Sequence, residues 1–310
     1  MNLRFKEFMS KIIIAGGTGF VGKYLQKQFH NLGYQVIIIS RKKENIQWQD
    51  TSEITAALEN SEMLINLAGR SVDCRYSKKN KTEILKSRTE TTKALGEAIL
   101  RCNNPPELWI NSSTATIYRH AEDKPMTESR GEIGTGFSVD VATSWEKSFF
   151  SFPLPDTRQV ALRMAIVLGK DGGVMKPMIN LVRFGLGGKQ GNGNQIFSWI
   201  HIEDLFNIIL FFQSHKALKG VFNCSAPHPI DNKTLMKTLR QAMKVKIGLP
   251  SPEWLLQIGA TIIRTEPELI LKSRWVVPEK LLEAGYSFKY PTLDGALKNI
   301  LENKQSTTVD

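Results

Sequence analysis

The sequence predicts an α/β fold, a doubly wound parallel sheet followed by a smaller and mostly helical region. Over the first 170 residues, short apolar runs rich in β-branched residues alternate with helical patterns, which is typical of strands joined by helical crossovers. The apolar runs are continuous, as expected of strands buried on both faces. A glycine-rich turn also joins the first run to the first helix, where such sheets hold ligands.

The predicted elements follow one another in a regular order. The first strand, KIIIAG, begins at Lys11, and a helix runs from the glycine turn to about Asn31, before the strand YQVIIIS. A helix near residues 52–59 precedes the strand MLINLAG, and a long helix ending near residue 101 precedes LWINSST. A helix near residues 137–150 precedes the apolar run VALRMAIVLG. Parallel strands connected in this way require right-handed crossovers.

Composition narrows the class of protein. The chain has 310 residues, 41% of them hydrophobic, and a net charge of +11. No apolar run approaches the roughly 18 residues of a membrane helix, and the first ten residues lack the features of a secretory signal. Three widely spaced cysteines, Cys74, Cys102 and Cys224, match neither a metal site nor a disulfide framework. We therefore expect a cytoplasmic protein without a membrane partner.

The positive charge admits nucleic acids or anionic metabolites as partners. The densest basic stretch, Ser77–Arg88, contains no aromatic residue to stack on a base and leads into a helical pattern. The solvated face of a helix explains this basic stretch, so no nucleic-acid partner is expected.

The turn GGTGFVG carries the spacing Gly16-x-x-Gly19-x-x-Gly22 between a strand and a helix. Gly16 permits the tight turn, Gly19 lets a pyrophosphate approach the backbone, and Gly22 lets the helix pack closely. The N–H groups and the dipole at the helix start favour the anion. A glycine turn without a ligand is the alternative. The predicted dinucleotide contacts in the turn are Gly16, Thr18, Gly19, Phe20, Val21 and Gly22.

The end of the second strand indicates which dinucleotide binds. An Asp or Glu there meets a free 2′-hydroxyl, but this chain has Ser40 and Arg41, with Lys42 and Lys43 behind. An arginine pairs with a 2′-phosphate, and such a charge-assisted bond contributes about 1.5–3 kcal/mol, which is about tenfold to a hundredfold in affinity. The alternative is that Arg41, Lys42 and Lys43 are solvated and bind no ligand. We predict NADP(H) as the cofactor.

The glycine spacing, with INLAG at Ile65–Gly69 and SSTATIY at Ser112–Tyr118, resembles the extended branch of the short-chain dehydrogenase/reductases, which includes nucleotide-sugar epimerases and dehydratases. The chain is most similar to an epimerase-like subfamily of unknown reaction, sometimes labelled as cell-division inhibitors. Four further segments carry this resemblance: Ser87–Leu95, Leu162–Met175, Phe184–Leu205 and Val276–Leu297. The last is similar to the C-terminal domain of unknown function that marks the subfamily.

The resemblance implies further cofactor contacts. INLAG ends a strand beside the cofactor, and Ser87 and Arg88 lie near it on the next helix. Arg163 stands where extended members contact the nicotinamide side. The contacts implied outside the glycine turn and the second strand are Asn66, Leu67, Ala68, Gly69, Arg88, Ser112 and Arg163.

The usual catalytic dyad is absent. Typical members use a Ser or Thr, a Tyr that transfers the proton, and a Lys four residues beyond the Tyr. Thr114 matches the first position, but Phe137 and Val141 stand where Tyr and Lys would be, and neither has a proton or a charge to give. The subfamily commonly shares this absence. We predict Thr114 and Tyr118 as catalytic. Other candidate proton donors are Glu128, Asp140 and His120.

The substrate side is predicted from later segments. Arg119 replaces the glycine that usually follows this tyrosine, and it either charges the pocket mouth in favour of an anionic substrate or points to solvent. A glycine- and amide-rich loop, residues 187–195, is typical of a binding lid or of a hairpin turn. Asp204 is placed to cap the helix after it. His201 has no partner at metal-ligand spacing, so no metal is expected. The predicted substrate-side residues are Arg119, Gln195, Trp199, His201 and Asn223.

These observations define the expected organisation and function. Residues 1–10 form an extension, residues 11–170 an NADP-binding Rossmann domain joined by a later strand near 195–225, and residues 171–310 a substrate-side region with a C-terminal domain from about 248. We expect an NADP(H)-dependent oxidoreductase or epimerase-like protein acting on a small substrate, nucleotide-linked ones included. The alternative is a non-catalytic NADP(H)-binding regulator. By resemblance, two long helices make a homodimer an option beside the monomer.

Overall fold

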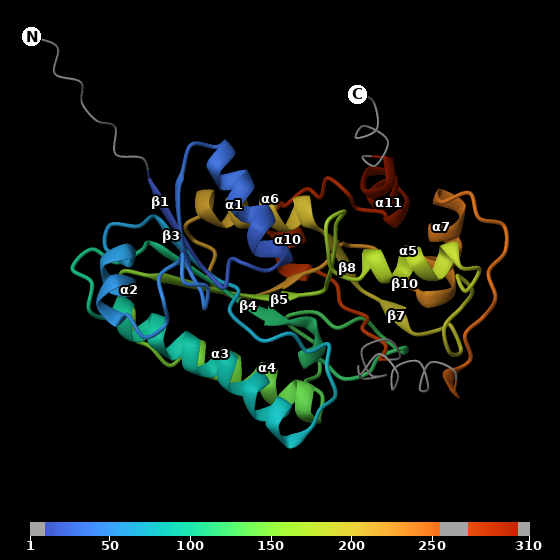
Figure 1. The fold of residues 1–310 in the computed structure, drawn as a ribbon, viewed down its shortest axis with the longest axis horizontal. Coiled ribbons are helices and arrows are strands. Elements are labelled where there is room, and N and C mark those ends of the chain that lie inside the picture. The colour runs from blue at the N-terminus through green and yellow to red at the C-terminus, as the bar shows by residue number, and fades with distance from the viewer. Residues whose placement is uncertain (1–9, 255–271, 303–310) are drawn as a thin grey trace, which may run out of the picture.

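The computed structural model describes residues 10–254 and 272–302. Its centre is a six-stranded, all-parallel sheet in the order β2-β1-β3-β4-β5-β9 (Figure 1). The strands are β1 (Lys11–Ala15), β2 (Gln35–Ile39), β3 (Met63–Asn66), β4 (Leu108–Thr114), β5 (Arg158–Met164) and β9 (Gly220–Cys224). The predicted doubly wound sheet is confirmed, and β9 is the later strand that returns to it.

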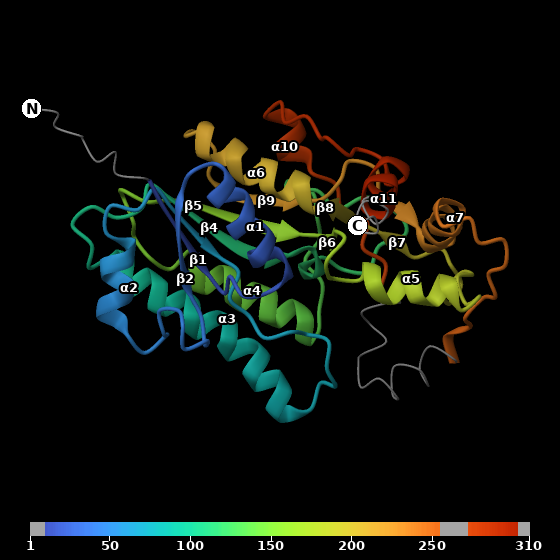
Figure 2. The ribbon, with the colours of Figure 1, turned by 45° about the horizontal axis from the view of Figure 1, so that its top comes forward.

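Helices cover both faces of this sheet. Helices α2 (Thr51–Leu58), α3 (Lys78–Ile99) and α4 (Phe137–Phe149) lie on one face, and α1 (Phe20–Asn31), α6 (Ile202–Ser214) and α10 (Glu279–Glu283) on the other (Figures 1 and 2). Residues of β1 alternate between the two cores: Ile12 and Ile14 pack with α1 and α6, whereas Ile13 packs with α2 and α3. Burial on both faces therefore accounts for the continuous apolar strands.

A second core forms beside the carboxyl end of the sheet. It is enclosed by α5 (Met175–Arg183), α7 (Asn232–Ala242) and α11 (Leu293–Glu302) (Figure 2). Trp199 is fully buried in this core. Two small sheets join this region to the large one: β6 (Ile166–Leu168) pairs with β8 (Trp199–His201), and β7 (Ile196–Phe197) with β10 (Ile230–Asp231).

The run VALRMAIVLG forms two strands where the sequence suggested one. The N–H of Ala165 still donates to the carbonyl of Cys224 on β9 (3.0 Å), but the N–H of Ile166 donates to the carbonyl of Ser198 (3.3 Å). The chain thus changes its hydrogen-bonding partner between adjacent residues. Apolar composition predicts burial on either side of this point and gives no sign of the change.

Candidate functional site

The glycine turn has the geometry of an anion cradle. Gly16 adopts φ +74°, and a Cβ there would lie 2.6 Å from the backbone nitrogen of Ala68, so only glycine fits. A Cβ on Gly22 would lie 2.4 Å from the Gly17 carbonyl oxygen. Around Gly19, the N-cap of α1, no heavy atom of the described residues would lie within 4 Å of an added Cβ. The first N–H groups of α1 therefore face open space that suits a pyrophosphate.

The end of β2 presents the predicted cation. Ser40 is buried, and its hydroxyl accepts hydrogen bonds from the N–H of Lys42 (3.0 Å) and from Nδ2 of Asn45 (2.9 Å). These bonds shape the loop that carries Arg41. Arg41 is exposed and has no hydrogen-bond or ion-pair partner within residues 10–254 and 272–302. The residues present therefore fit the 2′-phosphate of NADP(H), as the sequence predicts.

Hydrogen bonds of a buried side chain fix the carboxyl end of β3. Asn66 is fully buried, and its Nδ2 donates to Asn111 Oδ1 (2.7 Å) and Thr92 Oγ1 (3.0 Å), while its Oδ1 accepts from the N–H of Ala68 (3.0 Å). The Asn66 side chain therefore fixes the direction of the turn at Leu67–Gly69. The hydrogen bonds of its side chain go to protein groups, and its contact with the cofactor stays a prediction.

Arg88 reaches the same turn from α3. Its guanidinium is 3.1 Å from the Cβ that Gly69 lacks, and Nη1 donates to the carbonyls of Arg70 (3.1 Å) and Ile84 (3.0 Å). The guanidinium also lies over the Trp145 ring, 5.2 Å from its centre. Burial lowers the pKa of Arg88 to about 10. The helix thus brings a cation to the cofactor edge of the sheet, where the resemblance placed it.

Thr114 ends β4 at the carboxyl edge of the sheet and is half-buried. Its Oγ1 accepts from the N–H of Thr116 (3.2 Å) and lies 3.1 Å from Thr116 Oγ1, so Thr114 caps the short 3₁₀ helix η1 (Ala115–Ile117). Ser112, two residues earlier on β4, is 7% exposed. Of these two side chains, Thr114 is the one positioned to meet a ligand.

A buried polar network lies beneath this edge. Ser113, Arg163 and Asn223 occupy one register row on β4, β5 and β9. Arg163 binds Glu146 of α4 through Nε–Oε1 (2.9 Å) and Nη2–Oε2 (2.8 Å), and Ser113 Oγ donates to Glu146 Oε1 (2.6 Å). Arg163 Nη1 donates to the Tyr118 hydroxyl (2.9 Å), which donates to Asn223 Oδ1 (2.9 Å).

This network corrects three assignments made from the sequence. Tyr118 is 2% exposed and Asn223 0%, and the hydroxyl of Tyr118 is bonded to Arg163 and Asn223, so both side chains are enclosed by protein groups. Burial raises the pKa of Tyr118, although Arg163 opposes the shift. Arg163 is committed to Glu146, whose hydrogen bonds raise the pKa of Arg163 against the effect of burial. The network therefore joins the carboxyl edge of the sheet to α4. Its members, Tyr118, Arg163 and Asn223, hold the residues of the site in position from the protein interior.

The positions of the missing dyad are filled by packing residues. Val141 is buried, and the Phe137 ring lies 5.0 Å from the Tyr76 ring and 5.1 Å from Lys81 Nζ. Asp140 is exposed in the first turn of α4.

The remaining donor candidates differ in how their atoms are bonded. Glu128 Oε1 accepts from the N–H of Asn223 (2.7 Å), whereas its Oε2 is buried and has no hydrogen-bond partner in the described part of the chain, and burial raises the pKa of Glu128. His120 lies 3.5 Å from Glu122 and accepts from the N–H of Ser273 (3.2 Å). A role of either side chain as the proton donor stays a prediction.

Arg119 does not carry an uncompensated charge. Its guanidinium binds both carboxylate oxygens of Asp123 (2.9 and 2.7 Å) and Glu132 Oε2 (2.7 Å). Two carboxylates therefore neutralise the cation that the sequence offered as a substrate contact.

His201 takes the capping role that the sequence predicted for Asp204, and Asp204 has a different structural role. His201 is 3% exposed, and its Nδ1 accepts from the N–H of Glu203 (3.2 Å), so His201 is the N-cap of α6. Burial lowers the pKa of His201 to about 4. Asp204 is fully buried and accepts from the N–H groups of Lys289 (2.8 Å) and Tyr290 (2.9 Å). Asp204 thus joins α6 to the C-terminal region. Trp199 lies inside the second core and His201 is buried at the start of α6, so neither side chain is exposed on the predicted substrate side.

The glycine- and amide-rich loop is held against its neighbours. The N–H groups of Gly188 and Gly191 donate to the carbonyls of Leu249 (3.0 Å) and Ser251 (2.9 Å), and that of Gln190 to Asn232 Oδ1 (2.8 Å). Gln195 is 5% exposed, and its Oε1 has no hydrogen-bond partner in the described part of the chain. These contacts resemble neither a free lid nor a simple hairpin.

Two cations that the sequence analysis missed reach the end of β4. Lys272 Nζ donates to the Thr116 carbonyl (3.2 Å), and Arg274 Nε donates to Thr116 Oγ1 (3.3 Å). They belong to a segment, residues 272–276, that is bound to β7 and to Met126 through backbone hydrogen bonds. The sequence near them showed only packing patterns, and the contact spans more than 150 positions, so no local pattern could predict it.

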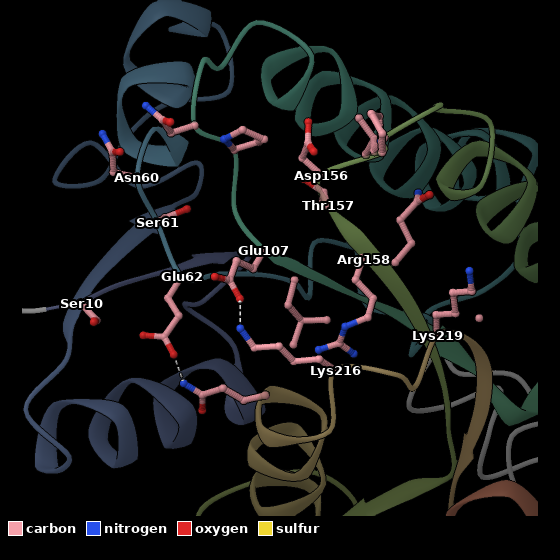
Figure 3. A pocket seen from close by; sticks show the side chains of 18 of the residues that line it. Ser10, Asn60, Ser61, Glu62, Glu107, Asp156, Thr157, Arg158, Lys216 and Lys219 are labelled. Atoms are coloured by element: carbon pink, nitrogen blue, oxygen red, sulfur yellow. Dashed lines mark hydrogen bonds and ion pairs between the residues drawn. The ribbon is translucent and has the colours of Figure 1, made fainter.

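One cavity lies away from the glycine turn. It measures about 1230 Å³ and is lined by residues such as Ser61, Glu107, Thr157 and Arg158 at the amino ends of the strands (Figure 3). Ligands of open parallel sheets bind at the opposite, carboxyl edge, where the glycine turn is. We therefore assign the site from the turn and not from this cavity.

Residues 10–254 and 272–302 contain neither a cluster of side chains that could hold a metal ion nor a helix that could cross a membrane. No three His, Cys, Asp or Glu side chains there are placed to hold a metal ion. None of the helices in these ranges is both long and apolar enough to cross a membrane.

Together, the glycine turn, the cation after β2 and the threonine at the end of β4 define a dinucleotide-binding protein of the extended short-chain dehydrogenase/reductase class. Comparisons with known proteins agree. Residues 12–136 match the NAD dependent epimerase/dehydratase family, and residues 251–300 match a domain of unknown function, DUF1731.

The chain is 32% identical over 296 residues to the human epimerase family protein SDR39U1, covering 94% of this chain and 99% of that one. It is 30% identical over 306 residues to the Bacillus subtilis epimerase family protein YfhF, covering 95% and 99%. The crystal structure of human SDR39U1 (isoform 2) with NADPH superposes with a TM-score of 0.86, covering 94% of this chain and 99% of that one. The chain belongs to this epimerase family.

Proposed function

We propose that this protein binds NADP(H) and acts as an oxidoreductase of the epimerase-like kind on a small substrate. The observation that carries the proposal is the glycine turn, whose Gly19 leaves open space before the start of α1. Arg41 is exposed and has no partner among the residues that the structure describes, which supports NADP(H) over NAD(H). The NADPH in the structure of the human relative supports the same choice.

The residues of the site have separate roles in this proposal. The N–H groups at the start of α1 hold the pyrophosphate, and Arg41 holds the 2′-phosphate. Bound NADPH supplies the hydride, and Thr114 forms a hydrogen bond to the reacting oxygen of the substrate. Because Phe137 and Val141 cannot donate a proton, the proton comes from another group or from water.

A second candidate function is a non-catalytic NADP(H)-binding regulator. It is favoured by the packing roles of Phe137 and Val141 and by the burial of Tyr118. Loss of a positioned acid typically costs about 10²–10⁴-fold in rate, which disables a reductase and does not affect a sensor.

The first test is a titration of wild type and Arg41→Ala with NADPH and NADH, followed by nicotinamide fluorescence. We expect Arg41→Ala to weaken NADPH binding by about tenfold or more and to leave NADH binding unchanged. Lys43→Ala, a nearby exposed cation, is the matched control. Equal binding of both dinucleotides by wild type, or binding of neither, rejects the proposal.

The second test separates enzyme from regulator. Small carbonyl compounds are screened for NADPH oxidation by wild type, Thr114→Ala and Tyr118→Phe. An oxidation that Thr114→Ala slows while NADPH affinity is retained supports the enzyme. A protein that binds NADPH and oxidises it with no compound argues for the regulator. Oxidation at the same rate in wild type and both variants would mean that Thr114 and Tyr118 are not the catalytic residues.

We also propose a cytoplasmic location and a homodimer formed through α3 and α4. The three free cysteines support the first proposal, and the pairing of α3 with α4 along one face of the sheet supports the second. Microscopy of the tagged protein and analytical ultracentrifugation test them.

A further inference from the structure

A second cavity lies against α1 and α11. It measures about 450 Å³, which is within the usual size of small-molecule sites, about 300–1,000 Å³. Its lining comes from α1, the start of α6, the end of α11 and the loop at residues 169–171. The cavity therefore lies where the helices of the large sheet meet the second core, and ligands commonly bind at such junctions.

One part of the lining is apolar. Ile202 and Ile300 are 5% and 3% exposed, and Phe20 and Tyr24 add two aromatic rings. The Phe20 ring is held by the loop that follows β6, because a Cβ on Gly172 would lie 2.5 Å from it. This part of the cavity suits the apolar body of a ligand.

The same cavity presents hydrogen-bond donors that are not engaged. Lys23 and Lys27 are exposed and one turn apart on α1, hence on one face of the helix. Neither ammonium group has a partner within residues 10–254 and 272–302, nor does the Tyr24 hydroxyl or the Gln28 amide. Burial, together with Glu203, raises the pKa of Tyr24 to about 12, so its hydroxyl keeps its proton at neutral pH.

Little negative charge opposes these donors. Two carboxylates line the cavity: Glu203 binds Lys289 and accepts from the Tyr290 hydroxyl (3.0 Å), whereas Asp171 is exposed. His201 also lines the cavity, and burial lowers its pKa to about 4, so it is neutral at pH 7. The two lysines of α1 therefore outnumber the one carboxylate without a cation, and the cavity favours an anion.

We infer that this cavity binds a small organic anion, with its carboxylate or phosphate on Lys23 and Lys27 and its apolar body against Phe20. The Tyr24 hydroxyl donates to the same anionic group. This ligand is additional to the dinucleotide and to the substrate. Phe20 begins α1 directly after Gly19, so the ligand contacts the start of the helix that holds the pyrophosphate. The anion and NADPH are then linked, and each changes the affinity of the other by the same factor.

Calorimetric titration of the protein saturated with NADPH measures this binding, because NADPH occupies the pyrophosphate site. The probes are benzoate and phenyl phosphate, with inorganic phosphate and benzyl alcohol to test each half of the ligand alone. The variants are Lys23→Gln, Lys27→Gln and Tyr24→Phe. Lys219→Gln is the matched control, since Lys219 is an exposed lysine lining the cavity at the opposite edge of the sheet (Figure 3).

We expect benzoate or phenyl phosphate to bind wild type. Binding should fall about tenfold in each lysine variant of α1 and about threefold in Tyr24→Phe, and stay unchanged in Lys219→Gln. The tighter of the two probes tells a carboxylate ligand from a phosphate ligand. Inorganic phosphate and benzyl alcohol should each bind more weakly, because each lacks one half of the contacts. The substituted side chains are exposed or half-buried, so the melting temperature should not change.

NADPH titrations with and without the tighter probe measure the linkage. We expect the probe to change NADPH affinity about fivefold or more in wild type and less in Lys27→Gln.

Four results overturn the inference. They are no binding of either aromatic anion by wild type, an equal loss in Lys219→Gln, an NADPH affinity that the probe leaves unchanged in wild type, and an equal change in wild type and Lys27→Gln. The last result would mean that the probe competes at the dinucleotide site. Failure of wild type to bind NADPH rejects the proposed function instead, and the anion titrations without NADPH then test the cavity on its own.

Discussion

Replacement of Glu146 by glutamine is expected to destabilise the protein substantially. The side chains of Glu146 and Arg163 are 11% and 12% exposed, and removing one partner of such a buried pair costs about 3–5 kcal/mol because the other charge is left uncompensated. Glutamine still accepts from the Ser113 hydroxyl, but its amide N–H₂ faces an arginine that can only donate. We therefore expect a loss of about 3 kcal/mol in the free energy of unfolding.

Urea unfolding at pH 7, followed by tryptophan fluorescence, measures this loss. Glu107→Gln is the control, because the Glu107–Lys216 pair is 67% and 73% exposed and should contribute less than about 1 kcal/mol. The double variant Glu146→Leu with Arg163→Met should recover part of the stability, since it removes both buried charges. Equal losses in Glu146→Gln and Glu107→Gln, or a double variant no more stable than Glu146→Gln, would refute the reasoning.

Three further predictions concern other parts of the molecule. Gly19→Ala, with open space around its Cβ, should keep the melting temperature and weaken NADPH binding; Gly16→Ala, with φ +74° and a backbone clash, should lower the melting temperature itself. Burial lowers the pKa of His201 to about 4, so the unfolded chain binds more protons than the native state between about pH 6.5 and 4, and stability falls by about 3 kcal/mol as the pH drops through this window. Urea unfolding at pH 7 and 4.5 should show a smaller fall in His201→Asn, which keeps a capping acceptor; an unchanged fall contradicts this. Tyr118→Phe should cost about 1–3 kcal/mol in unfolding free energy, because Asn223 and Arg163 lose a buried partner, and no loss would contradict the network.

The fold and the cofactor edge were predictable because their determinants are local. The alternation of apolar runs and helical patterns follows the chain, and the turn at Gly16–Gly22 needs only a strand before it and a helix after it. Arg41 was predictable for the same reason, since it directly follows β2.

The interior of the site was not predictable in this way. Tyr118 and Asn223 are 105 positions apart and meet because β4, β5 and β9 are neighbours in register. Along a strand, successive side chains point to opposite faces, so Ser113 turns to α4 while its neighbours do not. The contact of Arg274 with Thr116, 158 positions away, depends on how the C-terminal region folds back over the sheet. The spacing of residues along the sequence therefore does not predict which of these distant residues come into contact.

The place of β9 in the sheet limits how the molecule can be divided. Between β5 and β9 the chain leaves the sheet, contributes β8 and α5 to the second core, and only then returns to pair with β5. A fragment cut at residue 170 would leave β5 as a bare edge with open backbone hydrogen bonds, a template for aggregation. The large sheet and the second core are therefore not modules that recombination or engineering can exchange at a single junction. A transplanted cofactor domain has to include the chain at least through Cys224, and so includes much of the predicted substrate side.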